Sequence, residues 1–307
     1  MRSARLALVF FLALLLAACG GKEEVRPVSP TGSPIASPTL TAPTTPAPGE
    51  ATAAPVTGTP VSFTTEDDLT IKGRLFGSGE TAVVFAHMFP NDQRAWWGFA
   101  SEVAGQGYAA LTFDFRGYGE TGGSKDIARI DRDLAAAVRY LRERGYQRVI
   151  LVGASMGGTA ALKVAARDEF EGLVAGVVAV SAPQAFQGLV ARDDVADIKV
   201  PMLFVASEGD GVAFESLEAF YERATGPKEQ QVYSGDAHGT QLLEGEHAQE
   251  FKALLFDFFR KVACCCGGLQ ASTAGRDLKV APTCLHAAAG ERPRQEPERP
   301  RLKPGPR

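Results

Sequence analysis

The sequence predicts an α/β fold with a mostly parallel central sheet and helices on both faces. Short apolar runs alternate with helix-like segments over residues 81–262, a pattern typical of parallel sheets. One run, 149–152, reads Val-Ile-Leu-Val, the composition of a strand buried on both faces. A glycine-rich turn and the alanine-rich segment 159–166 follow directly, so we expect a strand, a tight turn and a helix here.

The elements before and after this stretch follow from local patterns. Residues 61–65 and 69–76 alternate apolar with polar residues around two aspartates, which predicts an antiparallel hairpin at a sheet edge. The other expected strands are 81–86, 109–113, 173–180, 202–206 and 230–233, and the other expected helices are 96–105, 126–145 and 251–262. The segment 181–199 has room for one short helix, around 184–192, and therefore for a minimal lid or none.

Composition narrows the classes of partner. Of the 307 residues, 45% are hydrophobic and 22% are charged, as in a globular protein. The net charge is −4, and the segment 264–307 carries +4, which leaves −8 for the rest. An acidic body argues against nucleic acid as a partner. No cysteine lies between residues 20 and 263, and no pair has the spacing of a zinc site, so we expect no metal.

The first residues have the pattern of an export signal. Two arginines precede the apolar run 6–18, which is too short to span a bilayer. The run ends in Leu-Ala-Ala-Cys-Gly and resembles the bacterial lipobox, in which the cysteine, here Cys19, is acylated. We therefore expect residues 1–18 to be a signal peptide and Cys19 to anchor the protein to the cell membrane or outer envelope on its extracytoplasmic face. An ordinary signal peptide with an incidental cysteine is the alternative.

Two segments flank the expected domain, which covers residues 61–263. Residues 19–60 hold the lipidated cysteine and a spacer rich in proline and threonine, which we expect to be disordered. Residues 264–307 have no apolar period and are predicted to be a disordered basic tail. A displaced reading frame and a tail that touches anionic envelope polymers are the two further interpretations of this segment.

The turn after the central strand carries the pattern of a nucleophile elbow. Gly153-Ala154-Ser155-Met156-Gly157 is G-x-S-x-G placed between a strand and a helix. The serine must sit on a strained turn, and strand and helix then pass so close that Gly153 and Gly157 must be small. The start of the helix also directs free N–H groups toward an anion forming near Ser155. The alternative is a glycine-rich turn with an idle serine.

A serine needs a base, and the base needs a group that orients it. His238 follows the last expected strand and is the predicted base. Asp210 follows the strand 202–206, at the carboxyl edge where ligands bind in such sheets, and is the predicted acid, with Glu208 as the alternative. His87 is expected to brace a loop rather than to react.

With its order of Ser155, Asp210 and His238, the stretch 61–262 resembles the α/β-hydrolases, near the dienelactone-hydrolase-like serine esterases. The loop 86–92 is similar to the family's His-Gly-x-x loop, and 114–119 is similar to its D-x-R-G-x-G loop. The charged Asp114 and Arg116 beside glycines suggest that the second loop is structural and is held by ion pairing and hydrogen bonds. The resemblance implies that the backbone N–H groups of Phe89 and Met156 form the oxyanion hole. Met88 stands where the family usually has glycine, so the choice of Phe89 over Met88 stays open.

The resemblance implies a serine hydrolase that cleaves carboxylic esters of small or medium acyl groups through an acyl-enzyme on Ser155, with a small-molecule ester as partner and no cofactor. A peptidase, a thioesterase or an acyltransferase on the same triad is the alternative, as is a non-catalytic envelope-binding lipoprotein. The residues that could line the site are Met156, Phe89, Trp96 or Trp97, Phe186 and Leu189. The sequence predicts neither the natural substrate nor the oligomeric state.

Overall fold

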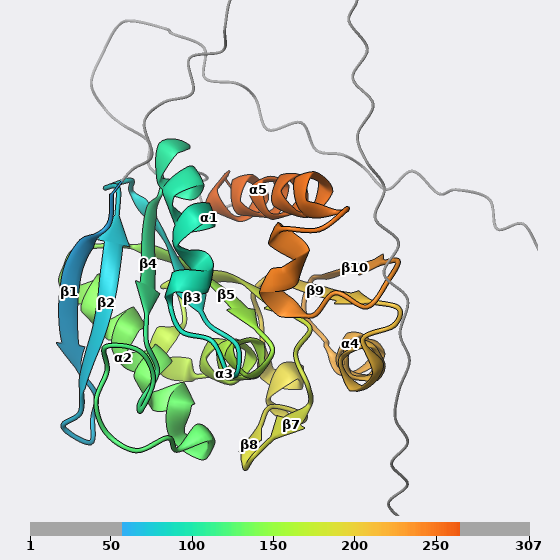
Figure 1. Ribbon diagram of the computed structural model, residues 1–307, viewed down its shortest axis with the longest axis horizontal. Coiled ribbons are helices and arrows are strands. Elements are labelled where there is room, and N and C mark those ends of the chain that lie inside the picture. The colour runs from blue at the N-terminus through green and yellow to red at the C-terminus, as the bar shows by residue number, and fades with distance from the viewer. Residues whose placement is uncertain (1–56, 265–307) are drawn as a thin grey trace, which may run out of the picture. The chain divides into compact units, whose positions relative to one another are not determined.

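A computed structural model describes residues 57–264 (Figure 1). Its main feature is an eight-stranded sheet with the order β1-β2-β4-β3-β5-β6-β9-β10. Within the described residues, β2 alone runs against the other strands of this sheet. The strands are β1 (Thr59–Thr64), β2 (Thr70–Phe76), β3 (Thr81–Ala86), β4 (Ala109–Phe113), β5 (Arg148–Ala154), β6 (Val174–Val180), β9 (Met202–Ser207) and β10 (Lys228–Tyr233). The predicted mostly parallel sheet is confirmed.

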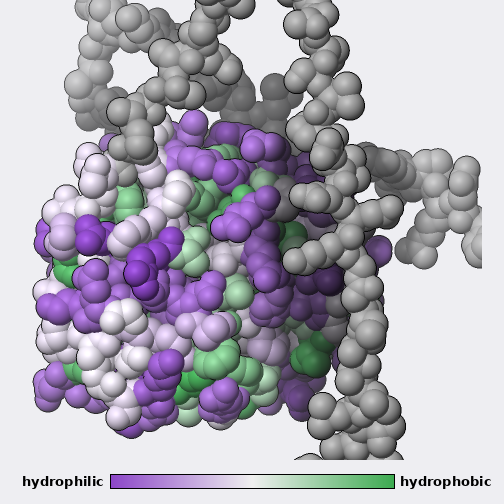
Figure 2. Space-filling view, viewed as in Figure 1, coloured by the Kyte–Doolittle hydropathy of each residue, from purple (hydrophilic) through white to green (hydrophobic). Residues whose placement is uncertain are grey.

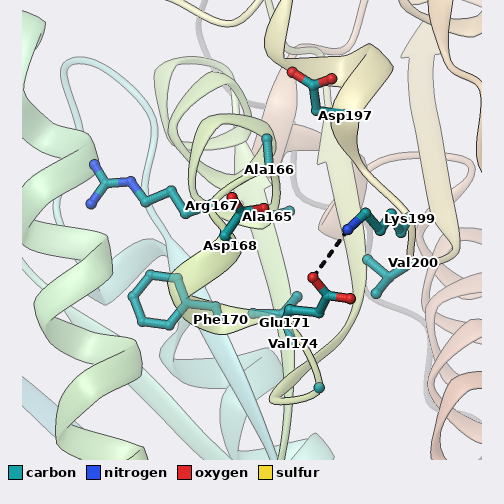
Figure 3. A pocket seen from close by; sticks show the side chains of 11 residues that line it. Ala165, Ala166, Arg167, Asp168, Phe170, Glu171, Val174, Asp197, Lys199 and Val200 are labelled. Atoms are coloured by element: carbon teal, nitrogen blue, oxygen red, sulfur yellow. Dashed lines mark hydrogen bonds and ion pairs between the residues drawn. The ribbon is translucent and has the colours of Figure 1, made fainter.

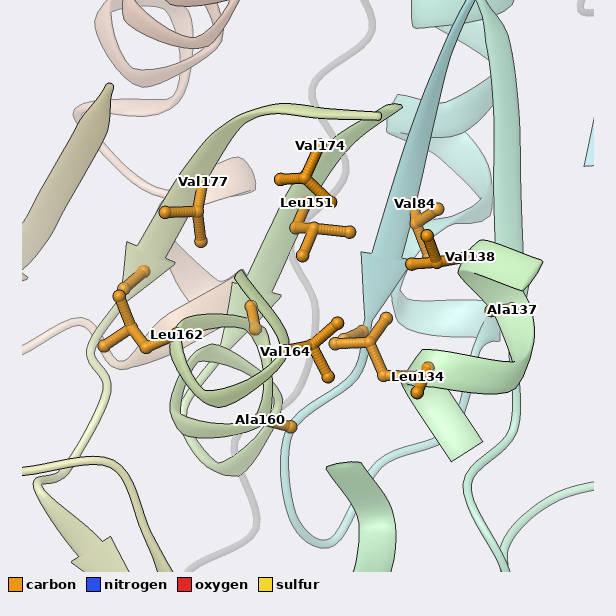
Figure 4. Packing of buried hydrophobic residues seen from close by; sticks show 14 of the residues in the cluster. Val84, Leu134, Ala137, Val138, Leu151, Ala160, Leu162, Val164, Val174 and Val177 are labelled. Atoms are coloured by element: carbon orange, nitrogen blue, oxygen red, sulfur yellow. The ribbon is translucent and has the colours of Figure 1, made fainter. Parts of the chain in front are cut away.

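Helices cover both faces of the sheet, as predicted. Helices α1 (Arg94–Gly105) and α5 (Ala248–Cys264) lie on one face, and α2 (Ile130–Glu143), α3 (Met156–Ala165) and α4 (Gly211–Arg223) lie on the other (Figure 1). The buried strand β5 divides its side chains between the two layers. Leu151 packs toward α2 and α3, as the close view of that layer shows (Figure 4), and Val149 belongs to the same buried cluster. Ile150 and Val152 pack toward α1 and α5 instead. This alternation is why the run is apolar at every position.

The prediction of a short helix around residues 184–192 was wrong. Two very short strands, β7 (Ala185–Phe186) and β8 (Leu189–Val190), form an antiparallel hairpin there. The residues between them, Gln187 and Gly188, have φ values of 45° and 88°. Two consecutive positive φ values are typical of the type I′ turn, which matches the twist of paired strands and cannot continue a helix. The segment between β6 and β9 nevertheless holds no lid domain, as expected.

Helix α4 was not anticipated from the sequence. It buries Ala213, Leu217 and Phe220 at the spacing of one helix face. This signal was present in the sequence but follows directly on the glycine-rich segment 208–211, which reads as a loop. Within 126–145 the helix α2 begins only at Ile130, after a 3₁₀ turn over Ile127–Arg129. Gly145 follows α2 with a φ of 88°, which agrees with its predicted place at the end of the helix.

The carboxyl ends of the parallel strands bring the predicted site residues to one edge of the sheet. Ser155 follows β5, Asp210 follows β9, and His238 follows β10. Among the described residues there is no helix that is both long and apolar enough to cross a membrane. The predicted signal peptide, Cys19, most of the spacer and the tail from residue 265 lie outside the described residues.

Candidate active site

Ser155 occupies a strained turn between β5 and α3. Its backbone has φ 50° and ψ −119°, in a region that residues other than glycine rarely enter. The strand holds the turn from the other side, because the Ser155 N–H donates a hydrogen bond of 2.8 Å to the carbonyl oxygen of Val180 in β6. Strain at a single serine between a buried strand and a helix start is the geometry that a nucleophile elbow requires.

The glycines on either side of Ser155 have no room for a side chain. A Cβ on Gly153 would lie 2.1 Å from the carbonyl oxygen of Gly157, and a Cβ on Gly157 would lie 2.4 Å from that of Ala86. Both contacts are with backbone, which cannot move aside cheaply. The close approach of Gly157 to residue 86 also places the start of α3 directly against the loop that follows β3.

We expect Gly153→Ala to lower the free energy of unfolding by about 3 kcal/mol, because the new methyl group would press strand and helix apart. Gly98→Ala is the matched control: Gly98 is exposed on α1, and a methyl group there would meet no atom of another element within 4 Å, so alanine should stabilise by about 0.5–1 kcal/mol. Urea unfolding of both variants provides the measurement. Equal stability of Gly153→Ala and the wild type would contradict the close approach.

His238 and Asp210 form a hydrogen-bonded pair. Nδ1 of His238 lies 2.8 Å from Oδ1 and 2.9 Å from Oδ2 of Asp210. Their side chains are 32% and 12% exposed, so the carboxylate is largely shielded while the imidazole remains accessible. Glu208, the alternative acid, is exposed and binds through its backbone N–H to the carbonyl oxygen of Tyr233. The structure therefore brings Asp210, and not Glu208, to the histidine.

The loop that carries His238 packs against the elbow. Gly239 has a φ of 58°, and a Cβ there would lie 3.2 Å from Cβ of Ala154, the residue before Ser155. The Gly239 N–H donates to Oγ of Ser181 at 3.0 Å. Among the described residues no hydrogen bond joins Ser155 Oγ to His238; such bonds often tighten only once a substrate is bound. The three predicted residues thus gather from three strands at one place.

His87 braces the loop after β3. The buried Phe115 N–H donates to its Nε2 at 3.1 Å, so the proton of the neutral ring is on Nδ1, which donates to the carbonyl oxygen of Met88 at 3.0 Å. Burial lowers the pKa of His87 and keeps the ring neutral. A neutral ring with both nitrogens engaged has no free site for chemistry, which agrees with the structural role that the sequence indicated.

The two amides expected to form an oxyanion hole lie in adjacent segments. Met156 is the first residue of α3, where a backbone N–H has no acceptor within the helix. Phe89 belongs to the loop after β3, and the close contact of Gly157 with the carbonyl oxygens of Ala86 and His87 holds that loop against the helix start. The Met88 side chain is buried whereas Phe89 is 41% exposed.

Residues 81–234 match the family model described as the alpha/beta hydrolase fold. The chain belongs to the α/β hydrolase fold family. Over 225 residues it is 24% identical to the uncharacterized protein YfhR of Escherichia coli (strain K12). The aligned region covers 64% of this chain and 79% of YfhR.

Solved hydrolase structures share the fold. The esterase Pf2001 of Pyrococcus furiosus superposes with a TM-score of 0.59 at 20% identity, covering 67% of this chain and 90% of that one. An esterase from Exiguobacterium antarcticum gives a TM-score of 0.56 at 18% identity, covering 65% and 99%. At this level of identity the likeness establishes the shared architecture.

In the hydrolase the loop after β4 is held by hydrogen bonds and ion pairs, as predicted, and Asp114 and Arg116 each have their own partners. Asp114 accepts hydrogen bonds from the backbone N–H groups of Gln93 and Glu120, both at 2.8 Å. Arg116 instead lies between Asp133 of α2, at 2.6 Å, and Asp67 of the β1–β2 turn, at 2.9 Å. The loop is pinned as expected, but by carboxylates that are remote in the sequence.

The Arg116 network predicts a specific response to acid. Hydrogen bonds from Arg116 and Thr65 hold the pKa of Asp67 well below its ordinary value of 3.8. Such a carboxylate stabilises the fold fully above its unfolded pKa and progressively less as the pH falls toward its folded pKa. We expect Asp67→Asn to cost about 1 kcal/mol near neutral pH, because solvent screens this partly exposed group, with the difference from wild type shrinking below about pH 4.

Unfolding measured between about pH 2.5 and pH 7 checks this expectation. Asp68→Asn is the matched control, because Asp68 is exposed, lies outside the network and has a φ of 60° that asparagine tolerates. A pH-independent difference for Asp67→Asn, or the same profile for both variants, would be incompatible with the role of Arg116.

Apolar side chains emerge near the site. The large hydrophobic side chains that are exposed in the described part of the hydrolase are Phe89, Val190 and Val212, and they follow the carboxyl ends of β3, β6 and β9. Phe89 also contacts the ring of Phe186, with 5.9 Å between centroids. Figure 2 shows hydrophobic surface gathered at the lower edge of the view, near the β7–β8 hairpin, on a largely hydrophilic face. We call Phe89, Phe186, Val190 and Val212 the apolar rim.

Other residues expected to line the site do not. Trp96 is fully buried, where its Nε1–H donates to the carbonyl oxygen of Ala86, and Leu189 is also fully buried. Trp97 lies under the guanidinium of Arg74, 4.8 Å from its ring centre. Trp96 and Leu189 therefore belong to the core, and Trp97 packs against Arg74.

A small cavity lies away from this edge. Its volume is about 40 Å³, and it is lined by residues that follow α3 or precede β6 and β9, as Figure 3 shows with the Lys199–Glu171 ion pair at its side. These residues lie at the amino ends of the strands, opposite the edge that carries Ser155. No group of three or more His, Cys, Asp or Glu side chains within residues 57–264 is arranged to hold a metal ion.

Proposed function

We propose that this protein is a serine hydrolase that cleaves carboxylic esters through an acyl-enzyme on Ser155. One observation carries the proposal: the strained Ser155 turn lies against the loop of His238, and His238 is hydrogen-bonded to Asp210. A strained backbone, a largely shielded acid and an accessible imidazole, each from the end of a different strand, are costly to maintain together. A structural role for the serine would need none of them.

The geometry suggests how the reaction proceeds. Oγ of Ser155 attacks the ester carbonyl while Nε2 of His238, the ring nitrogen not bound to Asp210, accepts the hydroxyl proton. The negative charge on the carbonyl oxygen is stabilised by the N–H groups of Met156 and Phe89. His238 then protonates the departing alcohol, and a water activated by the same ring releases the acid.

The apolar rim favours substrates with an apolar group. Exposed Phe89 and Val190 offer contact to an acyl chain close to the elbow without enclosing it, since the segment between β6 and β9 forms a hairpin and no lid. Small and medium acyl groups fit such an open site. Two proteins of similar fold, from Pyrococcus furiosus and Exiguobacterium antarcticum, are described as esterases, which agrees with ester cleavage.

We further propose that Cys19 carries lipid and holds the hydrolase at the extracytoplasmic face of the membrane. The support is the leader pattern of residues 1–20. Metabolic labelling with an alkyne fatty acid in a bacterial host, with Cys19→Ala as control, tests it: label that persists in the variant would remove the lipobox interpretation.

Labelling of the purified protein with a fluorophosphonate probe tests the proposed chemistry. We expect wild-type labelling that vanishes in Ser155→Ala, together with turnover of p-nitrophenyl esters. Product analysis with alcohol and amine acceptors, and assays on amide and thioester substrates, separates an esterase from an acyltransferase, a peptidase and a thioesterase. A folded protein that neither labels nor turns over any of these substrates would favour a binding protein on a hydrolase scaffold.

A further inference from the structure

The Met88 side chain joins the loop after β3 to the loop after β10. Its sulfur accepts hydrogen bonds from Oγ1 of Thr240 at 3.3 Å and from the Thr240 N–H at 3.5 Å. Met88 and Thr240 are only 7% and 6% exposed, so water offers little replacement for these bonds. Thr240 lies two residues after His238, and Met88 lies one residue before Phe89. One side chain therefore links the segment of the base to the segment of an oxyanion donor.

The space for this link is made by a glycine. A Cβ on Gly239 would lie 2.7 Å from the Met88 sulfur and 3.2 Å from Cβ of Ala154. Gly239 also has a φ of 58°, a conformation that favours glycine. The Met88 sulfur thus fills the space beside Gly239, which follows His238. Gly239 also lies next to Ala154, which precedes Ser155.

The backbone of Met88 is fixed independently of its side chain. Its carbonyl oxygen accepts the hydrogen bond from Nδ1 of His87, whose Nε2 in turn accepts from the Phe115 N–H. Two loops after neighbouring strands therefore anchor the residue that reaches across to Thr240. An anchored side chain can transmit position, whereas a loosely held one could only fill space.

We propose that Met88 is a positioning residue of the site, in which its thioether sets the loop of His238 relative to the oxyanion amides. The inference rests on the proposed function. The sulfur is a weak acceptor, but it accepts from two buried donors of Thr240. Leaving a buried donor without an acceptor costs free energy, so a loop conformation in which these donors are unpaired is destabilised. Without the sulfur the loop would shift to satisfy them, and a shift of about 1 Å at a catalytic group can cost about 100-fold in rate.

A double-mutant cycle tests the link. Met88→Leu keeps the volume and removes the acceptor, and Thr240→Val keeps the shape and removes the hydroxyl donor. We expect each change to lower kcat for p-nitrophenyl acetate by about tenfold with KM within about twofold. The double variant should be little worse than Met88→Leu alone, because leucine already removes the acceptor of both Thr240 hydrogen bonds.

Met202→Leu is the matched control. Met202 is fully buried at the start of β9, at the opposite edge of the sheet, and the same change there should leave kcat within about twofold. A Met88→Leu enzyme with kcat within about twofold of wild type would overturn the proposal, as would losses that multiply in the double variant.

A spectroscopic readout separates this inference from the proposed function. The Nδ1 proton shared between His238 and Asp210 should give a downfield proton resonance, assigned by its loss in His238→Asn. We expect the resonance in the wild type and in Met202→Leu, and a shifted or exchange-broadened one in Met88→Leu and Thr240→Val. An unchanged resonance in those two variants would overturn the positioning role. The expected change in a protein without ester turnover would support positioning and refute the hydrolase reaction.

Discussion

Ser155→Ala is expected to lower kcat/KM for p-nitrophenyl acetate by about 10⁴-fold or more, because the acyl-enzyme can then no longer form. The residual rate would come from the oxyanion amides and from substrate binding, which the substitution leaves in place. The fold should persist, since the Ser155 N–H keeps its hydrogen bond to Val180 and the side chain loses only a hydroxyl group.

The control for this prediction is stability. Urea unfolding of Ser155→Ala should stay within about 1 kcal/mol of the wild type, which separates loss of chemistry from loss of structure. Turnover that remains undiminished in a pure, folded variant would remove Ser155 from the mechanism and direct attention to another nucleophile.

Asp210→Asn is expected to lower kcat by about 10³–10⁴-fold. The asparagine amide would present a donor to Nδ1 of His238, favouring the tautomer that places the proton on Nε2. The base would then be protonated at the nitrogen that must accept the Ser155 proton. The measurement is kcat across about pH 6–9, with KM followed in the same assays.

Glu208→Gln is the matched control for the acid. It makes the same carboxylate-to-amide change two residues earlier, on an exposed side chain whose residue binds Tyr233 through its backbone. We expect activity within about twofold of the wild type. The reverse outcome, a large loss in Glu208→Gln and a small one in Asp210→Asn, would assign the acid to Glu208 and contradict the pairing seen in the fold.

Much of the order of strands and helices could be predicted because it depends on patterns of residues that are close together in the sequence. The β5 run, the glycines at positions 153 and 157 and the strands over 81–86 and 109–113 each depend on residues a few positions apart. Short apolar segments were harder to assign. The hairpin at 185–190 looked like a helix because six residues cannot separate the two periods, and only the positive φ values at Gln187 and Gly188 decided it.

Part of the candidate site could likewise be predicted from the sequence, and part of it required the structure. Its three predicted residues could be chosen because each follows a strand and parallel strands end at one edge. The choice of Asp210 over Glu208 required the turn after β9, which directs one carboxylate toward His238 and leaves the other exposed. The sequence offered Trp96 as a residue that could line the site, but its side chain is fully buried, because aromatic residues of a core and of a site look alike in a sequence.

The sequence by itself determined the alternating order of strands and helices and the G-x-S-x-G turn, because these depend on neighbouring residues. It also determined the net negative charge, which depends on composition alone. Only the tertiary structure decided the partners that lie far apart in the chain. Arg116 binds Asp67 across 49 positions, and Thr240 donates to Met88 across 152 positions. No local pattern encodes such contacts, since their geometry is set by how the strands order themselves in the sheet and bring remote loops to one edge.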